Sequence, residues 1–301
     1  MAVATATATR PVAVIGAGTM GSGIAQVFAA AGRQVTLGDQ DEASLKRGLA
    51  SIGKSLDRLV KKGTMDAAAR EQVLGRIRGA TRGAGGIGGA AWASSLKECA
   101  IAIEAVPEKL DLKKAVLQEL DRFLPADAIL ATNTSSISIT ELAAATKRPS
   151  KVVGMHFMNP VPVMQLVEVV RGFETSEETV SATMDFARAV GKTPVLVEDR
   201  PGFVSNRVLL PMINEAIFAL QEGVATREAI DTVMKLGMNH PIGPLALADL
   251  IGLDVCLDIM EVLHKGFGDD KYRACPLLRT MVAAGRLGRK SGRGFYEYSD
   301  S

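Results

Sequence analysis

The sequence predicts an α/β fold, in which a doubly wound, mostly parallel sheet is followed by an all-α C-terminal domain. Short runs rich in Val and Ile alternate with helical stretches up to about residue 198, which is typical of strands joined by crossover helices. A glycine-rich turn at 16–21 joins the first apolar run to a helix. After the breaker EDRPG at 198–202, four helical stretches follow without an intervening strand.

The expected strands are seven short apolar runs, at 12–15, 35–37, 101–105, 129–132, 152–156, 165–170 and 195–197. A helical insertion rich in Lys and Arg lies at about 42–75 and is longer than one crossover needs. The glycine-rich segment 78–92 predicts either a poorly ordered loop or a weak strand. The helices of the C-terminal domain are expected at 203–222, 226–236, 244–264 and 276–284.

The composition limits the possible partners. The 301 residues suffice for two domains, and the formal net charge of +2 gives no reason to expect binding to nucleic acid or to a membrane. No apolar stretch reaches membrane-spanning length, and residues 1–9 lack the features of a signal peptide, so we expect a disordered leader there. Three cysteines without metal-ligand spacing predict no metal site and a reducing, cytoplasmic setting.

The turn GAGTMG at 16–21 has the spacing of a dinucleotide-binding loop. Gly16 permits a sharp turn, Gly18 lets the backbone approach a pyrophosphate, and Gly21 allows the helix to pack closely on the strand. The helix that begins here directs its first N–H groups toward the anion.

Asp39 ends the second expected strand, where a carboxylate accepts hydrogen bonds from ribose hydroxyls and repels a 2'-phosphate. Alone, it would fit a turn residue better, but with the glycine turn in place we assign it to the ribose. The sequence thus predicts a Rossmann-type domain with NAD as its cofactor. The expected cofactor-binding residues are Gly16, Gly18, Thr19, Met20, Gly21 and Asp39.

Polar side chains also follow the later strands, at 104–109, 133–136 and 156–159. In an open parallel sheet the carboxyl ends of the strands meet at one edge, which is where ligands bind. Segment 133–136 fits turn and N-cap chemistry equally well, and a lone histidine such as His156 is more often a satisfied core residue.

Glu168 changes the interpretation of His156. It lies within the apolar run LVEVV at 166–170, where an ionised carboxylate is costly to bury unless it is paired. A histidine is a suitable partner, because the carboxylate fixes the imidazole tautomer and stabilises the imidazolium. A dehydrogenase needs such a pair, since removal of hydride from a carbinol carbon requires that the hydroxyl proton leave too. The alternative is that Glu168 is an edge-strand charge facing water.

Seven segments together resemble the 3-hydroxyacyl-CoA dehydrogenases, most closely the bacterial 3-hydroxybutyryl-CoA dehydrogenases, over nearly the whole chain. They are GAGTMGSGIAQ at 16–26, IEAVPE at 103–108, TNTSS at 132–136, MHFMNPVPVM at 155–164, PGFVSNR at 201–207, GMNHPIGP at 237–244 and GRKSGRGFY at 288–296. So many ordered matches are highly specific. The segment 78–92 departs from the regular strand and turn usual in the family.

The resemblance implies a role for each matching position. His156 is the acid/base and Glu168 its partner, while Ser135 and Asn206 hold the oxygen functions of the substrate. Three further residues, Glu108, Lys113 and Asn133, are assigned to the cofactor, the first two near its ribose and nicotinamide end. Since Asn206 belongs to the second domain, the active site is expected in a cleft between domains.

The expected organisation is therefore a disordered leader at 1–9, an NAD-binding Rossmann-type domain at 10–199 and an all-α domain for substrate binding and dimerisation at 200–301. The expected reaction interconverts (S)-3-hydroxyacyl-CoA, short-chain in particular, and 3-ketoacyl-CoA. Four basic residues, Lys54, Arg58, Lys61 and Lys62, fit either CoA phosphates or a solvated surface. The alternatives are a sugar-acid 3-dehydrogenase of the L-gulonate type and a non-catalytic, crystallin-like nucleotide-binding protein.

Overall fold

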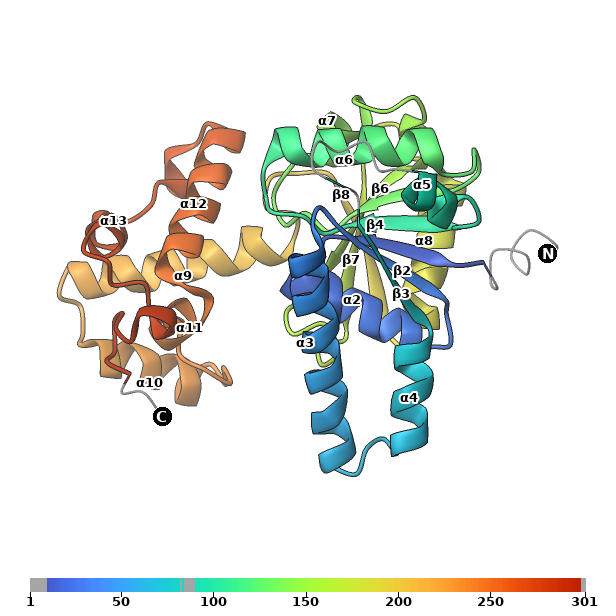
Figure 1. Cartoon of the computed structure of the whole chain (residues 1–301). Helices are drawn as coiled ribbons and strands as arrows, with labels where there is room; N and C mark the ends of the chain where they lie inside the picture. The colour runs from blue at the N-terminus through green and yellow to red at the C-terminus, as the bar shows by residue number, and fades with distance from the viewer. Residues whose placement is uncertain (1–9, 82, 84–89, 299–301) are drawn as a thin grey trace. The chain divides into compact units, whose positions relative to one another are not determined.

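A computed structural model describes residues 10–81, 83 and 90–298, so the expected leader at 1–9 lies outside the described residues. The chain divides into two compact units, Met1–Asp199 and Arg200–Ser301. Figure 1 shows a sheet with helices on its faces in the first unit and helices alone in the second. The predicted α/β fold with an all-α C-terminal part is confirmed.

The first unit is built on an eight-stranded sheet in the order β3-β2-β1-β4-β5-β6-β7-β8. Its strands are β1 Val12–Ile15, β2 Val35–Asp39, β3 Ile77–Thr81, β4 Ile101–Glu104, β5 Ile129–Thr132, β6 Val152–Phe157, β7 Leu166–Arg171 and β8 Thr193–Glu198. Every neighbouring pair is parallel except β6 and β7, which are antiparallel. Strands β1, β4 and β5 are buried along their whole length, which explains why they read as continuous apolar runs.

Helices cover the sheet and bury their apolar faces against it. They are α2 Thr19–Ala30, α5 Ala90–Leu96, α6 Leu110–Phe123, α7 Ile139–Ala143 and α8 Glu177–Ala189, with a 3-10 turn η1 at Pro149–Lys151. The rings of Phe28 in α2 and Phe186 in α8 pack with centroids 6.5 Å apart. Ser176 begins α8 by accepting a hydrogen bond from the Thr179 N–H through its side chain.

The insertion consists of two helices, α3 Glu42–Lys61 and α4 Ala67–Gly75, which begin at the capping carboxylates of Asp41 and Asp66. Figure 1 shows both helices extending beyond the sheet, with the loop between them at the tip. Strand β3 follows, so the weak-strand alternative holds for Ile77–Thr81, an element absent from the seven expected strands. Residues 82 and 84–89 of the glycine-rich segment lie outside the described part of the chain.

The second unit contains five α-helices among its described residues. They are α9 Ser205–Gln221, α10 Arg227–Gly237, α11 Pro244–Ile251, α12 Leu253–Phe267 and α13 Pro276–Ala283, with 3-10 turns η2 Asp270–Tyr272 and η3 Arg289–Ser291. The prediction of one helix over 244–264 is wrong, because Gly252 adopts φ +106° and separates α11 from α12. A non-glycine residue rarely adopts this backbone conformation.

The buried carboxylates of Asp249 and Asp231 bind the segment that contains Phe295 and Tyr296. Asp249 accepts hydrogen bonds from the N–H groups of Phe295 and Tyr296, each at 2.9 Å. Asp231 accepts the N–H of Leu245 at 2.8 Å and the hydroxyl of Tyr296 at 2.9 Å. These contacts give the C-terminal motif at 288–296 a structural role.

Within the described residues, no helix is both long enough and apolar enough to cross a membrane.

Candidate active site

The glycine turn packs as the spacing predicts. Gly16 has φ +105°, and a Cβ atom there would lie 2.5 Å from the carbonyl oxygen of Ala105. A Cβ at Gly21 would lie 1.7 Å from the oxygen of Gly16, so any side chain would separate α2 from β1. Gly18 has no heavy atom within 4 Å of its Cβ position among the described neighbours, which leaves its face open toward a ligand.

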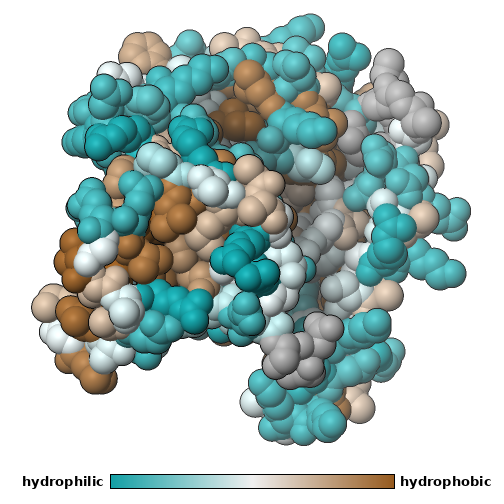
Figure 2. Space-filling view, turned by 90° about the vertical axis from the view of Figure 1, so that its left-hand side faces the viewer, coloured by the Kyte–Doolittle hydropathy of each residue, from teal (hydrophilic) through white to brown (hydrophobic). Residues whose placement is uncertain are grey.

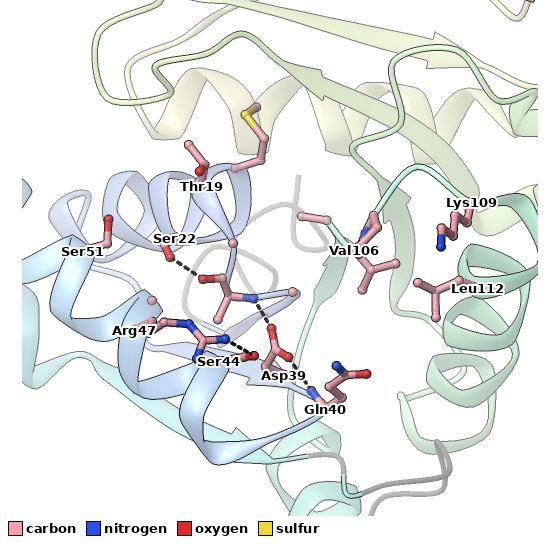
Figure 3. Close-up of a pocket in the computed structure, with 17 residues that line it drawn as sticks. Thr19, Ser22, Asp39, Gln40, Ser44, Arg47, Ser51, Val106, Lys109 and Leu112 are labelled. Atoms are coloured by element: carbon pink, nitrogen blue, oxygen red, sulfur yellow. Dashed lines mark hydrogen bonds between the residues drawn. The ribbon is translucent and has the colours of Figure 1, made fainter. Parts of the chain in front are cut away.

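This turn forms one wall of a pocket of about 780 Å³. Thr19 and Met20 line it at the start of α2, Asp39 lines it at the end of β2, and the segment after β4 closes it through Val106. In Figure 3 the Asp39 carboxylate points toward the turn, where it accepts the N–H of Ala17 at 2.7 Å. Open glycine backbone, helical N–H groups and a carboxylate together fit a dinucleotide.

Helix α3 supplies pocket residues that the sequence motif did not identify. Ser44, Arg47 and Ser51 line the pocket opposite Val106 (Figure 3). Their spacing of three and four residues places them on one helical face, and this pattern was available from the sequence. The expected basic residues Lys54, Arg58, Lys61 and Lys62 are exposed beyond them, the first three in α3 and the last at its C-cap.

His156 and Glu168 lie directly opposite each other in the antiparallel pair of β6 and β7. Nδ1 of His156 lies 2.8 Å from Oε2 of Glu168. Glu168 is 2% exposed, and β7 lies between β6 and β8, so the alternative of an edge-strand charge facing water is wrong. The pair leaves Nε2 as the ring nitrogen on the side away from the carboxylate.

Two tethers fix the backbone around His156. Oδ1 of Asn133, which follows β5, accepts the N–H of Phe157 at 2.9 Å. In the described structure, Asn133 thus ties β5 to β6 next to His156. Beyond β6, the buried ammonium of Lys192 donates to the carbonyl oxygens of Val161 and Met164 at 2.6 and 2.7 Å. Burial lowers the pKa of Lys192.

Glu104, at the end of β4, is fully buried and accepts four hydrogen bonds. Lys113 of α6 donates to both of its oxygens, at 2.8 and 3.0 Å. The Val106 N–H and the Thr132 hydroxyl donate to the same carboxylate at 2.7 and 2.6 Å. The sequence placed Glu104 at the ligand-binding edge but predicted no partner for it. Through its bonds to Val106, which lines the pocket, and to Thr132, this carboxylate connects the pocket wall with the end of β5.

Lys113 links this carboxylate to Glu108, which it approaches at 3.2 Å. Oε1 of Glu108 accepts hydrogen bonds from the Thr134 hydroxyl, at 2.6 Å, and from the N–H groups of Ser135 and Ser136. Burial alone would raise the pKa of Glu108, but the charge of Lys113 and the bonds from Thr134 and Ser135 outweigh it and hold this pKa below its ordinary value. Lys113 itself is 1% exposed, whereas Glu108 is 37% exposed and is the member of the pair accessible to a ligand.

Asn206 lies in the second unit, in the first turn of α9, and is partly exposed there. The preceding turn is set by Gly202, which has φ +75°, and by Phe203, which has φ +48°. A Cβ at Gly202 would lie 2.6 Å from a methyl carbon of Leu263, so glycine is required for steric as well as conformational reasons.

Comparison with known proteins assigns the chain to a family. The model of the 3-hydroxyacyl-CoA dehydrogenase NAD binding domain matches residues 11–200, and that of the C-terminal domain matches residues 202–298. The chain belongs to the 3-hydroxyacyl-CoA dehydrogenase family. This dehydrogenase is therefore an NAD-dependent oxidoreductase, as the glycine turn and Asp39 predict.

Three relatives illustrate the similarity. The chain is 55% identical to the probable 3-hydroxybutyryl-CoA dehydrogenase of Bacillus subtilis, covering 97% of this chain and 98% of that one. It is 50% identical to the 3-hydroxybutyryl-CoA dehydrogenase of Clostridioides difficile, with 95% and 99% covered. The crystal structure of (S)-3-hydroxybutyryl-CoA dehydrogenase from Ralstonia eutropha is similar at 51% identity and a TM-score of 0.91, with 97% and 100% covered.

Proposed function

We propose that this dehydrogenase interconverts (S)-3-hydroxybutyryl-CoA and acetoacetyl-CoA. The observation that carries the proposal is the buried contact between His156 and Glu168 at the ligand-binding edge of a sheet that also carries the dinucleotide pocket. The proposal is supported by relatives at 50% and 55% identity that are named 3-hydroxybutyryl-CoA dehydrogenases.

When bound, NAD accepts or supplies the hydride, and the protein manages the accompanying proton. In the oxidation, Nε2 of His156 takes the proton of the 3-hydroxyl group as the hydride leaves the same carbon. In the reduction, the imidazolium returns that proton to the ketone oxygen. Glu168 holds Nδ1 in its protonated form and stabilises the positive charge that the ring acquires.

The substrate oxygens need donors in addition to His156. We assign this role to Ser135 and Asn206, as the family resemblance implies. Ser135 is positioned by Glu108, which accepts its N–H at 2.9 Å. Its hydroxyl donates to the same carboxylate at 3.3 Å, and it would turn from this long bond to donate to the substrate oxygen. Glu108 in turn is held by Lys113, so the buried Glu104 supports this loop through two successive contacts.

The exposed basic residues of α3 are proposed to meet the CoA phosphates. Lys54, Arg58 and Lys61 lie within roughly 80° of Arg47 and Ser51 on the helical wheel, with 3.6 residues per turn. Since Arg47 and Ser51 line the dinucleotide pocket, the basic stripe continues directly from that pocket along the helix. Such a stripe attracts an anionic ligand, and the attraction weakens as salt screens it.

A homodimer formed through the second unit is also proposed. Several apolar side chains of that unit are more than half exposed, namely Val204, Val208, Val224, Val233, Leu236, Met238 and Leu250. Figure 2 shows brown, apolar side chains in patches on the face that it views. Exposed apolar side chains gathered in patches are typical of a subunit interface.

The experiment that tests the function is an assay with two pairs of substrates, in which NADH consumption or formation is followed. Acetoacetyl-CoA is compared with a free 3-keto acid in the reduction, and 3-hydroxybutyryl-CoA with L-gulonate in the oxidation. Turnover of the CoA thioesters with kcat/KM at least about a hundredfold higher supports the proposal. Preference for L-gulonate would favour the sugar-acid alternative, and no turnover of either substrate would favour a non-catalytic protein.

A further inference from the structure

The end of β2 contains more anion-binding groups than NAD requires. The two oxygens of the Asp39 carboxylate accept the N–H groups of Gln40 and Ala17, each at 2.7 Å. Figure 3 shows both bonds at the corner of the pocket where β2 meets α3. Two backbone donors therefore converge on this point, and the carboxylate of the protein itself binds them.

Arg47 faces the same corner from α3. Its Nη2 donates to the hydroxyl of Ser44 at 2.8 Å, and in Figure 3 the guanidinium lies beside that hydroxyl and near Asp39. The nearby carboxylate of Asp41 is committed to the helix N-cap, where it accepts the N–H and hydroxyl of Ser44 at 2.7 and 3.0 Å. The one guanidinium hydrogen bond is thus made to a neutral hydroxyl, and the charge of Arg47 acts on Asp41 only through space, so the other N–H groups of Arg47 can meet an incoming anion.

We infer that Arg47 is a specificity-determining residue that attracts a phosphate at the 2'-position of the adenosine ribose and opposes Asp39, which repels it. The inference rests on the placement of that ribose beside Asp39. The preference of the native enzyme for NAD is then the difference between two opposing charges rather than the effect of Asp39 alone. Without the Asp39 carboxylate, the N–H groups of Ala17 and Gln40 and the guanidinium of Arg47 form a donor set suited to a phosphate.

The experiment compares four proteins: the native chain, Arg47→Ala, Asp39→Ser and the double variant. Dissociation constants for NADH and NADPH are measured by cofactor fluorescence, and kcat/KM is measured for both cofactors with acetoacetyl-CoA. Lys46→Ala is the matched control, because Lys46 is the exposed neighbour of Arg47 on α3 and does not line the pocket. This control should leave the ratio of NADPH to NADH affinity unchanged.

Arg47→Ala should weaken NADPH binding at least about threefold more than NADH binding, since one favourable charge contact with the 2'-phosphate is lost. Asp39→Ser should improve the NADPH to NADH ratio at least about tenfold, and NADPH binding to it should weaken with salt. In the double variant most of that gain should disappear.

An equal effect of Arg47→Ala on both cofactors would overturn the inference, as would a gain of Asp39→Ser that persists in the double variant. Arg47 is exposed, so its single variant is expected to fold even if the Asp39 variant does not. The activity with NADH is a separate readout, because its loss would count against the proposed function and not against the role of Arg47.

Discussion

Nδ1 of His156 lies 2.8 Å from Oε2 of Glu168, and the two residues face each other across neighbouring antiparallel strands. Both side chains are buried, at 8% and 2% exposure. A charge held this way retains most of its effect on the ring, because little water screens it.

Replacement of His156 by Gln should lower kcat about 10²- to 10⁴-fold, since the acid/base is lost, while NADH affinity stays within about twofold. Steady-state kinetics and NADH titration check this prediction. His264→Gln is the control, because His264 forms a comparable contact, 3.0 Å from Asp270, on the surface of the second unit. Equal losses in the two variants would contradict the assignment of His156.

Glu168→Gln keeps the shape but removes the charge that stabilises the imidazolium, so kcat should fall strongly and the pH–rate profile should change. The losses of the two dyad variants should be non-additive in the double variant, because each residue acts through the other. If the double variant showed the product of two independent losses, Glu168 would not be the partner of His156.

Neighbouring lysines of α6 should differ sharply in their contribution to stability. Lys113→Met leaves the buried Glu104 without its counter-charge and should lower the free energy of unfolding by about 3–5 kcal/mol. Lys114 pairs with Glu141 at the surface, so Lys114→Met should cost less than about 1 kcal/mol. Urea unfolding of the two variants measures both values, and similar losses would show that burial of the pair is unimportant.

Glu108 should make the free energy of unfolding depend on pH in the acidic range. Its pKa is held below the ordinary value of 4.5 in the folded chain, so as pH falls the unfolded chain takes up this proton first. The contribution of Glu108 is therefore complete above pH 4.5 and is lost as pH falls through its lower folded-state pKa. Urea unfolding at about pH 6 and about pH 3 should show a smaller acid loss for Glu108→Gln than for the native chain. The exposed Glu174→Gln should behave as the native chain does.

The basic stripe of α3 should affect CoA but not shorter thioesters. The double variant Lys54→Ala/Lys61→Ala should raise KM for acetoacetyl-CoA and weaken its dependence on salt, because two charges near the phosphates are removed. For a thioester truncated to the pantetheine part of CoA, KM should be almost the same in the variant and the native chain. Lys46→Ala serves as the control on the same helix, and equal effects on both substrates would favour a solvated surface.

The native chain should sediment as a dimer at micromolar concentration. Leu236, at 83% exposure in α10, is a test position, since Leu236→Glu places a charge on the apolar surface and should shift the chain toward monomer. Val195→Glu, at an exposed position of β8 in the first unit, should leave the mass unchanged. A native monomer in analytical ultracentrifugation would contradict the interface.

Local features of the sequence are sufficient to predict several elements of the fold. The turn at Gly16, the helix that follows it and strands such as Val12–Ile15 depend on backbone freedom and apolar periodicity, which are properties of neighbouring residues. Two predictions were wrong or incomplete where the local signal was weak, at the helix over 244–264 and at the strand over 77–81. Gly252 broke an otherwise continuous apolar helix, and β3 formed from the half-exposed residues 77–81 because β2 offered an edge for pairing.

Which charged side chains pair with one another depends on the tertiary fold. The sequence left Glu168 either as the partner of His156 or as a charge facing water, and the antiparallel register of β6 and β7, which places His156 opposite it, decided between the two. The contact of Glu104 with Lys113 likewise joins residues from a strand and a separate helix, and Asp39 and Arg47 line one pocket from β2 and α3. Such pairs depend on strand order, register and helix packing, which follow from the burial of the whole core and leave no signature in the residues around either partner.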